Sequence, residues 1–82
     1  MNRFTTEPQP VAQNGTVKVC YDFTNANSPV HVVVKWDGAG NVDFWLSKAE
    51  PCTFLAVPPT ATGGLCIDES EQSEDHSITV TP

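Results

Sequence analysis

Apolar and polar residues alternate with a period of two along much of the chain. Over residues 16–24 the apolar positions are Val17, Val19, Tyr21 and Phe23, with polar or small residues between them. Successive side chains of a β-strand point to opposite faces. This alternation therefore predicts a strand that is buried on one face.

Two further segments, residues 30–36 and 42–47, alternate in the same way and flank a glycine-rich turn at 37–41. Glycine and asparagine tolerate the positive φ angles of tight turns, so the three segments together predict a β-hairpin. The alternation turns Trp36 toward the core of the hairpin and Trp45 toward solvent.

The register of this hairpin is predicted from its cross-strand pairs. On the outward face, Lys35 is expected opposite Asp43, and Val33 opposite Trp45. Opposite charges and apolar residues that face each other across an antiparallel pair stabilise it, so both pairs favour this register.

The rest of the chain divides into shorter segments of the same kind. Strands are expected at residues 4–6, 53–57, 65–68 and 77–81. Pro8 and Pro10 are typical of an edge strand that breaks or changes sheet. Seven strands at about ten-residue spacing, with no helical periodicity, predict a single all-β domain over residues 1–82, a two-layer antiparallel β-sandwich.

Two segments carry a resemblance to a known family. The segment PQPVAQNGTVKVCYDFTNAN resembles the first hairpin of bacterial immunoglobulin-like domains, and HSITVTP resembles their last strand. The resemblance, which extends to fibronectin type III domains, implies an immunoglobulin-like sandwich. It implies no particular activity, because this fold carries many functions.

Three cysteines, Cys20, Cys52 and Cys66, leave at least one thiol unpaired. Cys20, Trp36 and Cys66 follow the order of the cysteine, tryptophan and cysteine of antibody domains. Alternation, however, points Cys20 and Cys66 outward from opposite sheets, beyond the Cα separation of about 7 Å that a disulfide allows. We therefore expect free thiols and a reducing compartment, with a β-bulge as the alternative.

The charge distribution limits the classes of partner. The net charge is −6, and no Lys or Arg follows Lys48. Four basic residues cannot form the face that nucleic acids require, and no apolar run is long enough for membrane insertion. No signal peptide is visible, so we expect a cytoplasmic protein or one assembled into a particle, unless a signal has been removed.

The chain contains no recognised catalytic motif such as GxSxG, HExxH or a phosphate-binding glycine loop. The spacing of His31, His76 and the cysteines matches no compact zinc motif. We therefore expect neither an enzyme nor a protein with a bound cofactor.

An acidic segment at residues 68–75 is the most unusual local feature. Its carboxylates belong to Asp68, Glu69, Glu71, Glu74 and Asp75. Such oxygen donors suit Ca²⁺, although the segment lacks the spacing of an EF-hand. The alternative is a solvated turn whose charge keeps the protein soluble.

The outward residues of the predicted hairpin form a candidate contact surface of Trp45, Val33, His31, Lys35 and Asp43. Exposed aromatic residues commonly anchor binding interfaces. The alternative is that the proline-rich loop at 57–62 covers Trp45.

These observations favour a non-catalytic structural or protein-interaction module, within a surface, appendage or virion assembly, that binds another protein or itself. The second hypothesis is a small ligand-binding domain, with a carbohydrate stacked on Trp45 or Ca²⁺ held by residues 68–75.

Overall fold

The computed structural model describes residues 4–24, 26, 29–70 and 74–82, which form nine β-strands and no helix. The strands are β1 (Phe4–Glu7), β2 (Val11–Ala12), β3 (Thr16–Tyr21), β4 (Val30–Asp37), β5 (Asn41–Leu46), β6 (Cys52–Ala56), β7 (Gly63–Asp68), β8 (His76–Ile78) and β9 (Val80–Thr81). The all-β prediction is confirmed. The described residues also contain no helix with the length and apolar composition of a membrane span.

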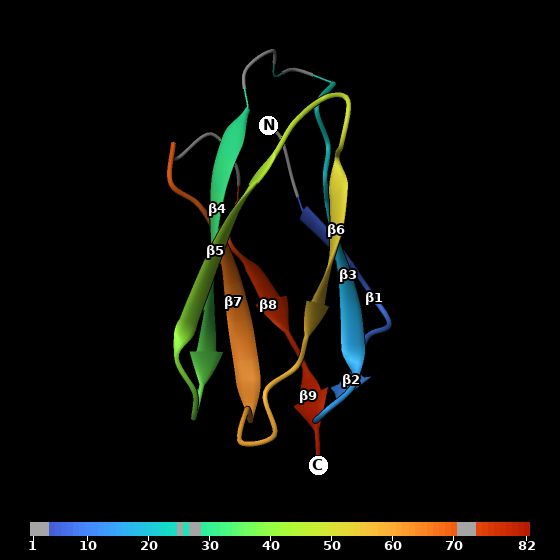
Figure 1. The fold of residues 1–82 in the computed structure, drawn as a ribbon, viewed down its shortest axis with the longest axis vertical. Coiled ribbons are helices and arrows are strands. Elements are labelled where there is room, and N and C mark those ends of the chain that lie inside the picture. The colour runs from blue at the N-terminus through green and yellow to red at the C-terminus, as the bar shows by residue number, and fades with distance from the viewer. Residues whose placement is uncertain (1–3, 25, 27–28, 71–73) are drawn as a thin grey trace.

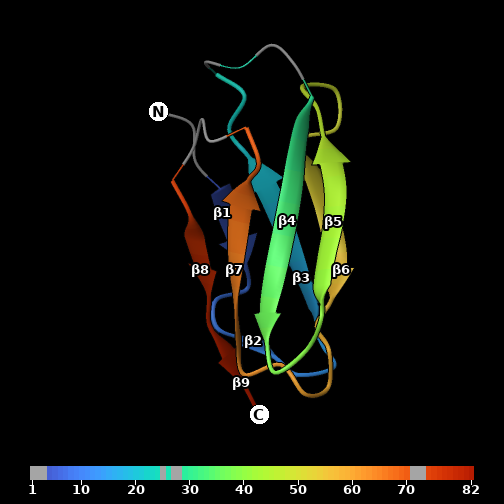
Figure 2. The ribbon, with the colours of Figure 1, turned by 90° about the vertical axis from the view of Figure 1, so that its left-hand side faces the viewer.

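The strands form two antiparallel sheets and one short parallel pair. One sheet has the order β5-β4-β7-β8 and the other the order β1-β3-β6, while β2 pairs in parallel with β9. Figure 1 shows the two larger sheets on opposite sides of the molecule. Figure 2 shows the four-stranded sheet face on, with β5 at one edge and β8 at the other.

The core consists of the apolar residues that alternation turns inward in both sheets. In β3, Val17, Val19 and Tyr21 are buried, as the sequence pattern predicts. The two tryptophans also follow the prediction: Trp36 is 5% exposed and Trp45 is 66% exposed.

The number of strands differs from the expected seven because both ends of the chain are divided. After β1 the chain passes Pro8 and Pro10 and pairs again at Val11, beside β9 instead of β3. The last predicted strand is interrupted at Thr79, whose N–H donates to Gln9 Oε1 at 2.9 Å.

The hairpin register is shifted by two residues from the predicted one. His31, and not Val33, lies opposite Trp45, and Val33 lies opposite Asp43. The turn is the physical reason, because the strands close around Gly38, whose φ of 83° lies in the left-handed region. A shift of two residues leaves every side chain on its predicted face.

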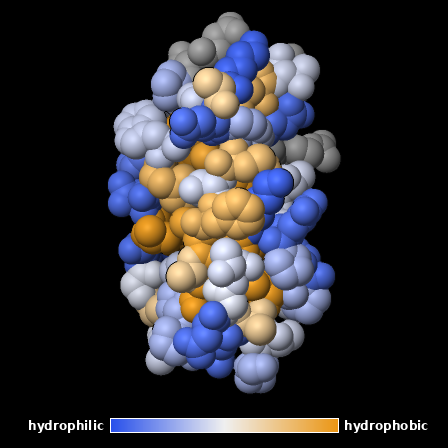
Figure 3. Space-filling view, turned by 45° about the vertical axis from the view of Figure 1, so that its right-hand side comes forward, coloured by the Kyte–Doolittle hydropathy of each residue, from blue (hydrophilic) through white to orange (hydrophobic). Residues whose placement is uncertain are grey.

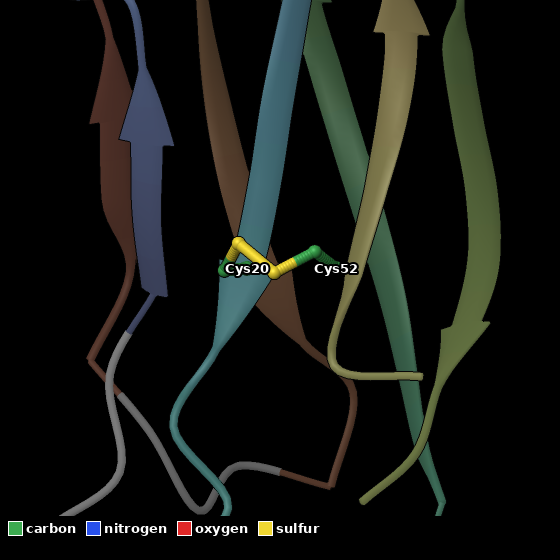
Figure 4. Close-up of a disulfide and its surroundings, with 2 residues drawn as sticks. All are labelled: Cys20 and Cys52. Atoms are coloured by element: carbon green, nitrogen blue, oxygen red, sulfur yellow. A yellow bond between two sulfur atoms is a disulfide. The ribbon is translucent and has the colours of Figure 1, made fainter. Parts of the chain in front are cut away.

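The prediction of free thiols is wrong for two of the three cysteines. Cys20 of β3 and Cys52 of β6 form a disulfide, with their Cα atoms 4.0 Å apart (Figure 4). The partner of Cys20 is not Cys66 of the other sheet but a cysteine directly opposite it on the neighbouring strand of the same sheet.

Cys66 is a free thiol, but it points inward and is fully buried, contrary to prediction. Alternation places Leu65 and Ile67 on one face of β7 and Cys66 on the other, and the structure turns the less apolar of these two faces inward. The inward face also holds Asp68, whose Oδ2 accepts a hydrogen bond from the Tyr21 hydroxyl at 2.9 Å. A buried carboxylate is tolerated when it is hydrogen-bonded in this way.

Candidate functional site

The outward side chains of β4 and β5 bring together the five residues predicted as a contact surface. Strand β4 contributes His31, Val33 and Lys35, and β5 contributes Asp43 and Trp45. The observed register places His31 beside Trp45 and Val33 beside Asp43. All five therefore lie on the outer face of the four-stranded sheet.

Two apolar residues of the same face were missed by sequence reasoning. Because Cys66 points inward, its neighbours Leu65 and Ile67 are half-buried on the outer face of β7. Ile67 pairs directly with Val33 of β4, and Leu65 pairs with Lys35. The prediction that Cys66 points outward places both of its neighbours in the core by alternation, so the sequence pattern could not reveal them on the outer face.

We name this arrangement the outer-face surface. Its apolar part is formed by Val33, Trp45, Leu65 and Ile67, and its polar rim by His31, Lys35, Asp43 and Glu69. An apolar centre with a polar rim is the usual composition of a protein–protein contact.

His31 occupies the centre of a polar cluster at one end of this surface. Its Nε2 lies 2.9 Å from Asp43 Oδ2, and its Nδ1 lies 3.3 Å from Glu69 Oε2. The ring also stacks on Trp45, with centroids 4.9 Å apart and planes inclined by 24°. The imidazole therefore holds the tryptophan side chain and both carboxylates in one arrangement.

The same contacts raise the pKa of His31 above its usual value. The hydrogen bond to Asp43 has the largest effect, while burial lowers the pKa and the charge of Glu69 raises it. A protonated imidazole donates from both nitrogens and can satisfy both carboxylates, whereas the neutral ring donates from only one. Protonation therefore stabilises the cluster.

The alternative in which a loop covers Trp45 is wrong. The tryptophan side chain remains 66% exposed. Val57 and Ala61, from the loop proposed as the cover, are buried in the hydrophobic core instead. The aromatic ring is therefore available for contact.

The described residues of the acidic segment do not come together in one site. Asp68 is 2% exposed, and its other oxygen accepts hydrogen bonds from the N–H and hydroxyl groups of Ser70. Glu69 faces His31, while Glu74 and Asp75 are exposed at the start of β8. Glu71 lies outside the described residues. Within the ranges that are described, no three His, Cys, Asp or Glu side chains are grouped to hold a metal ion.

The free thiol of Cys66 is not positioned for nucleophilic chemistry. Desolvation by burial raises its pKa to about 12, so the thiol is protonated at neutral pH. Its side chain is inaccessible from solvent.

Comparison with protein-family models, with curated proteins and with solved structures finds no match to this chain.

Proposed function

We propose that this chain is a non-catalytic protein-interaction module that binds a protein partner through its outer-face surface. The observation that carries the proposal is the apolar pair of Ile67 and Val33, with the exposed ring of Trp45 diagonal to Val33 on β5 and Leu65 on the same face of β7. Burial of these side chains stabilises a complex by about 25 cal/mol per Å² of apolar surface, before the costs of association.

The charged rim indicates the kind of partner. Asp43 and Glu69 are exposed and outnumber Lys35 at the edge of the surface. A partner with an apolar centre and a basic rim complements this charge. Association should therefore weaken as salt concentration rises, because exposed charges are screened.

We also infer that the two sheets are the layers of an immunoglobulin-like β-sandwich. The strand orders β1-β3-β6 and β5-β4-β7-β8, and buried residues from both sheets, support this inference. Nuclear Overhauser effects between Val19 of β3 and Val34 of β4, both fully buried, are expected. Their absence would contradict the face-to-face arrangement.

A surface, appendage or virion assembly is the context that we propose for this module. A small domain with one contact face can be a subunit or decoration of such an assembly. We expect the gene to lie beside genes for a capsid, tail or pilus, and a neighbourhood of metabolic genes would contradict this context.

A second candidate function is carbohydrate binding, because His31 stacks on the exposed Trp45 ring and contacts the carboxylates of Asp43 and Glu69. Aromatic rings stack on sugars while carboxylates accept their hydroxyl hydrogen bonds. Titration with oligosaccharides while Trp fluorescence is recorded tests this function, and an unchanged spectrum across a glycan panel removes it.

Quantitative co-purification with matched variants tests the main proposal. The wild-type chain, Trp45→Ser, Ile67→Ser and the control Phe54→Ser are isolated from cells that naturally produce the protein. Phe54 is 69% exposed on the other sheet, so its replacement controls for loss of an exposed aromatic residue. We expect the partner to remain with the wild type and the control and to be lost from both outer-face variants. Retention by folded Trp45→Ser and Ile67→Ser proteins would refute the proposal.

A further inference from the structure

Strand β6 ends the three-stranded sheet, and among the described residues one of its edges pairs with no strand. Its neighbour β3 pairs along one side, with Cys20 opposite Cys52 and Lys18 opposite Phe54. Directly opposed residues in an antiparallel pair alternate between hydrogen-bonded pairs and closer, non-hydrogen-bonded pairs. The 4.0 Å separation of the Cys20 and Cys52 Cα atoms identifies theirs as a non-hydrogen-bonded pair.

The hydrogen bonds at the two ends of the strand confirm this alternation. Tyr21 N–H donates to Pro51 C=O at 2.9 Å, and Val57 N–H donates to Gly15 C=O at 2.9 Å. Residues 51, 53, 55 and 57 therefore direct their backbone groups toward β3 and the residues beside it. The N–H and C=O groups of residues 52, 54 and 56 point to the open edge, where no strand pairs in the part of the chain that is described.

This edge lacks two of the features that normally prevent strand pairing. Natural proteins protect edge strands with charged residues, prolines, bulges or covering segments. Between Cys52 and Val57, strand β6 carries no charged residue and no proline, and its Phe54 side chain is 69% exposed. By contrast, the opposite edge of this sheet, at β1, is linked to β8. The Thr6 hydroxyl forms a hydrogen bond with His76, and the Gln9 side-chain amide donates to the Ser77 carbonyl.

The surface around β6 is also apolar. Figure 3, which brings this side of the molecule forward, shows hydrophobic residues gathered across the middle of the face. The apolar side chains that the two edge strands leave exposed or half-buried on this side are Val42 and Phe44 of β5 and Phe54 and Leu55 of β6. Burial of these groups adds apolar contact to any backbone pairing at the edge.

We propose that the free edge of β6 pairs antiparallel with β6 of a second copy, about a two-fold axis at Phe54. Phe54 then faces its own equivalent, and Cys52 faces Ala56 of the other copy. Because these same three residues carry the free backbone groups, each donor meets an acceptor and three hydrogen-bonded pairs form. The two sheets become one six-stranded sheet with the order β1-β3-β6-β6-β3-β1.

Symmetry favours a second copy over another occupant. The net charge of −6 on each chain opposes association of two copies, but they meet along a strand without a charged residue, and salt screens the more distant charges. The central Phe54 is flanked by the smaller Cys52 and Ala56, so the paired aromatic rings have room in a self-complementary, isologous contact. Pro58, which has no N–H, would lie opposite Glu50 in this register and ends the ladder there.

The size of the contact predicts a weak dimer. Five residues of edge strand bury less than the roughly 1,200 Å² found at the lower end of stable interfaces. We expect a dissociation constant on the order of 100 μM, so the dimer dominates only at high local concentration, as in an assembly.

Sedimentation equilibrium from about 10 μM to about 1 mM tests the dimer, spanning the expected dissociation constant. Phe54→Glu places two carboxylates at the two-fold axis, while Lys18 opposite it keeps the β3–β6 pairing favourable. Ala56→Pro removes an N–H that points to the free edge, where proline is tolerated. Each variant should weaken association at least about tenfold, while Trp45→Ser should dimerise like the wild type.

Amide hydrogen exchange of the wild type gives a second readout that needs no variant. The amides of Cys52, Phe54 and Ala56 should exchange rapidly in dilute solution and become protected as concentration rises.

A chain that stays monomeric at about 1 mM, or a dimer that neither β6 variant weakens, would overturn the proposal. Protection of these amides only in complex with another protein would overturn the choice of a second copy. Loss of the dimer only in Trp45→Ser would place self-association on the outer-face surface instead.

Discussion

Removal of the Cys20–Cys52 disulfide should cost a large part of the stability of this domain. The bond joins residues 32 positions apart and restricts the unfolded chain to a closed loop. In the chain-entropy description, a loop of this length lowers the entropy of the unfolded state by about 12.4 cal/mol/K, which corresponds to about 3.7 kcal/mol at 25 °C. Both cysteines are half-buried on the outer face of their sheet, so their replacement by alanine adds little loss of core packing.

The stability lost with the disulfide is a large fraction of the total free energy of unfolding, so it is easy to measure. Small domains unfold at a cost of roughly 5–15 kcal/mol, and a domain of 82 residues belongs in the lower part of this range. Urea unfolding of the Cys20→Ala/Cys52→Ala double variant, followed by far-ultraviolet circular dichroism, should give a free energy of unfolding lower by about 2–4 kcal/mol than that of the wild type.

Reduction provides the matched control. Dithiothreitol should destabilise the wild type by a similar amount and leave the double variant unchanged. Thiol titration of the denatured, unreduced wild type should detect Cys66 alone. A stability difference below about 1 kcal/mol, or reactivity at all three cysteines without reductant, would refute the assignment of this disulfide.

Three further predictions concern single side chains. Asp43→Asn should lower the pKa of His31 in an NMR titration, because the hydrogen bond to Asp43 is the largest cause of its rise. An unchanged His31 titration in the variant would contradict the role of Asp43. Because the folded-state pKa of His31 lies above its unfolded value, the stability that His31 contributes is present below about pH 6.5 and is lost as the pH rises through the folded-state pKa. Cys66 should react with iodoacetamide only after unfolding, because burial raises its pKa to about 12 and shields it. Gly38→Ala should destabilise the hairpin by about 1–3 kcal/mol in urea unfolding, because φ is 83° and an added Cβ would lie 2.6 Å from the Thr60 carbonyl oxygen; a neutral effect would show that the turn has another conformation.

The sequence contained enough information to orient the side chains of the central strands. Period-two alternation correctly placed Trp36 inside and Trp45 outside, because burial of one face dominates the energetics of such strands. It could not set the hairpin register, since a slip of two residues preserves both faces. The conformation of Gly38 decides the register, and that is a property of the folded turn.

The errors in the candidate site have a common physical origin in contacts between distant strands. Strand β7 turns its less apolar face inward, and the hydrogen bond between Tyr21 and the inward Asp68 joins residues far apart in sequence. The pairing of Cys20 with Cys52 likewise depends on β6 being the neighbour of β3. Local alternation carries no information about which strands become neighbours, so Leu65 and Ile67 became visible on the outer face only once the sheets were assembled.

Site-specific photo-crosslinking tests the outer-face surface most directly. A benzophenone amino acid replaces Trp45, which is exposed and of comparable size, and the control carries it at Thr5, exposed on the other sheet. After irradiation in cells that naturally produce the protein, position 45 should give one covalent adduct with a second protein and position 5 should give none. Adducts at both positions, or at neither, would contradict the assignment of the outer face as the binding surface.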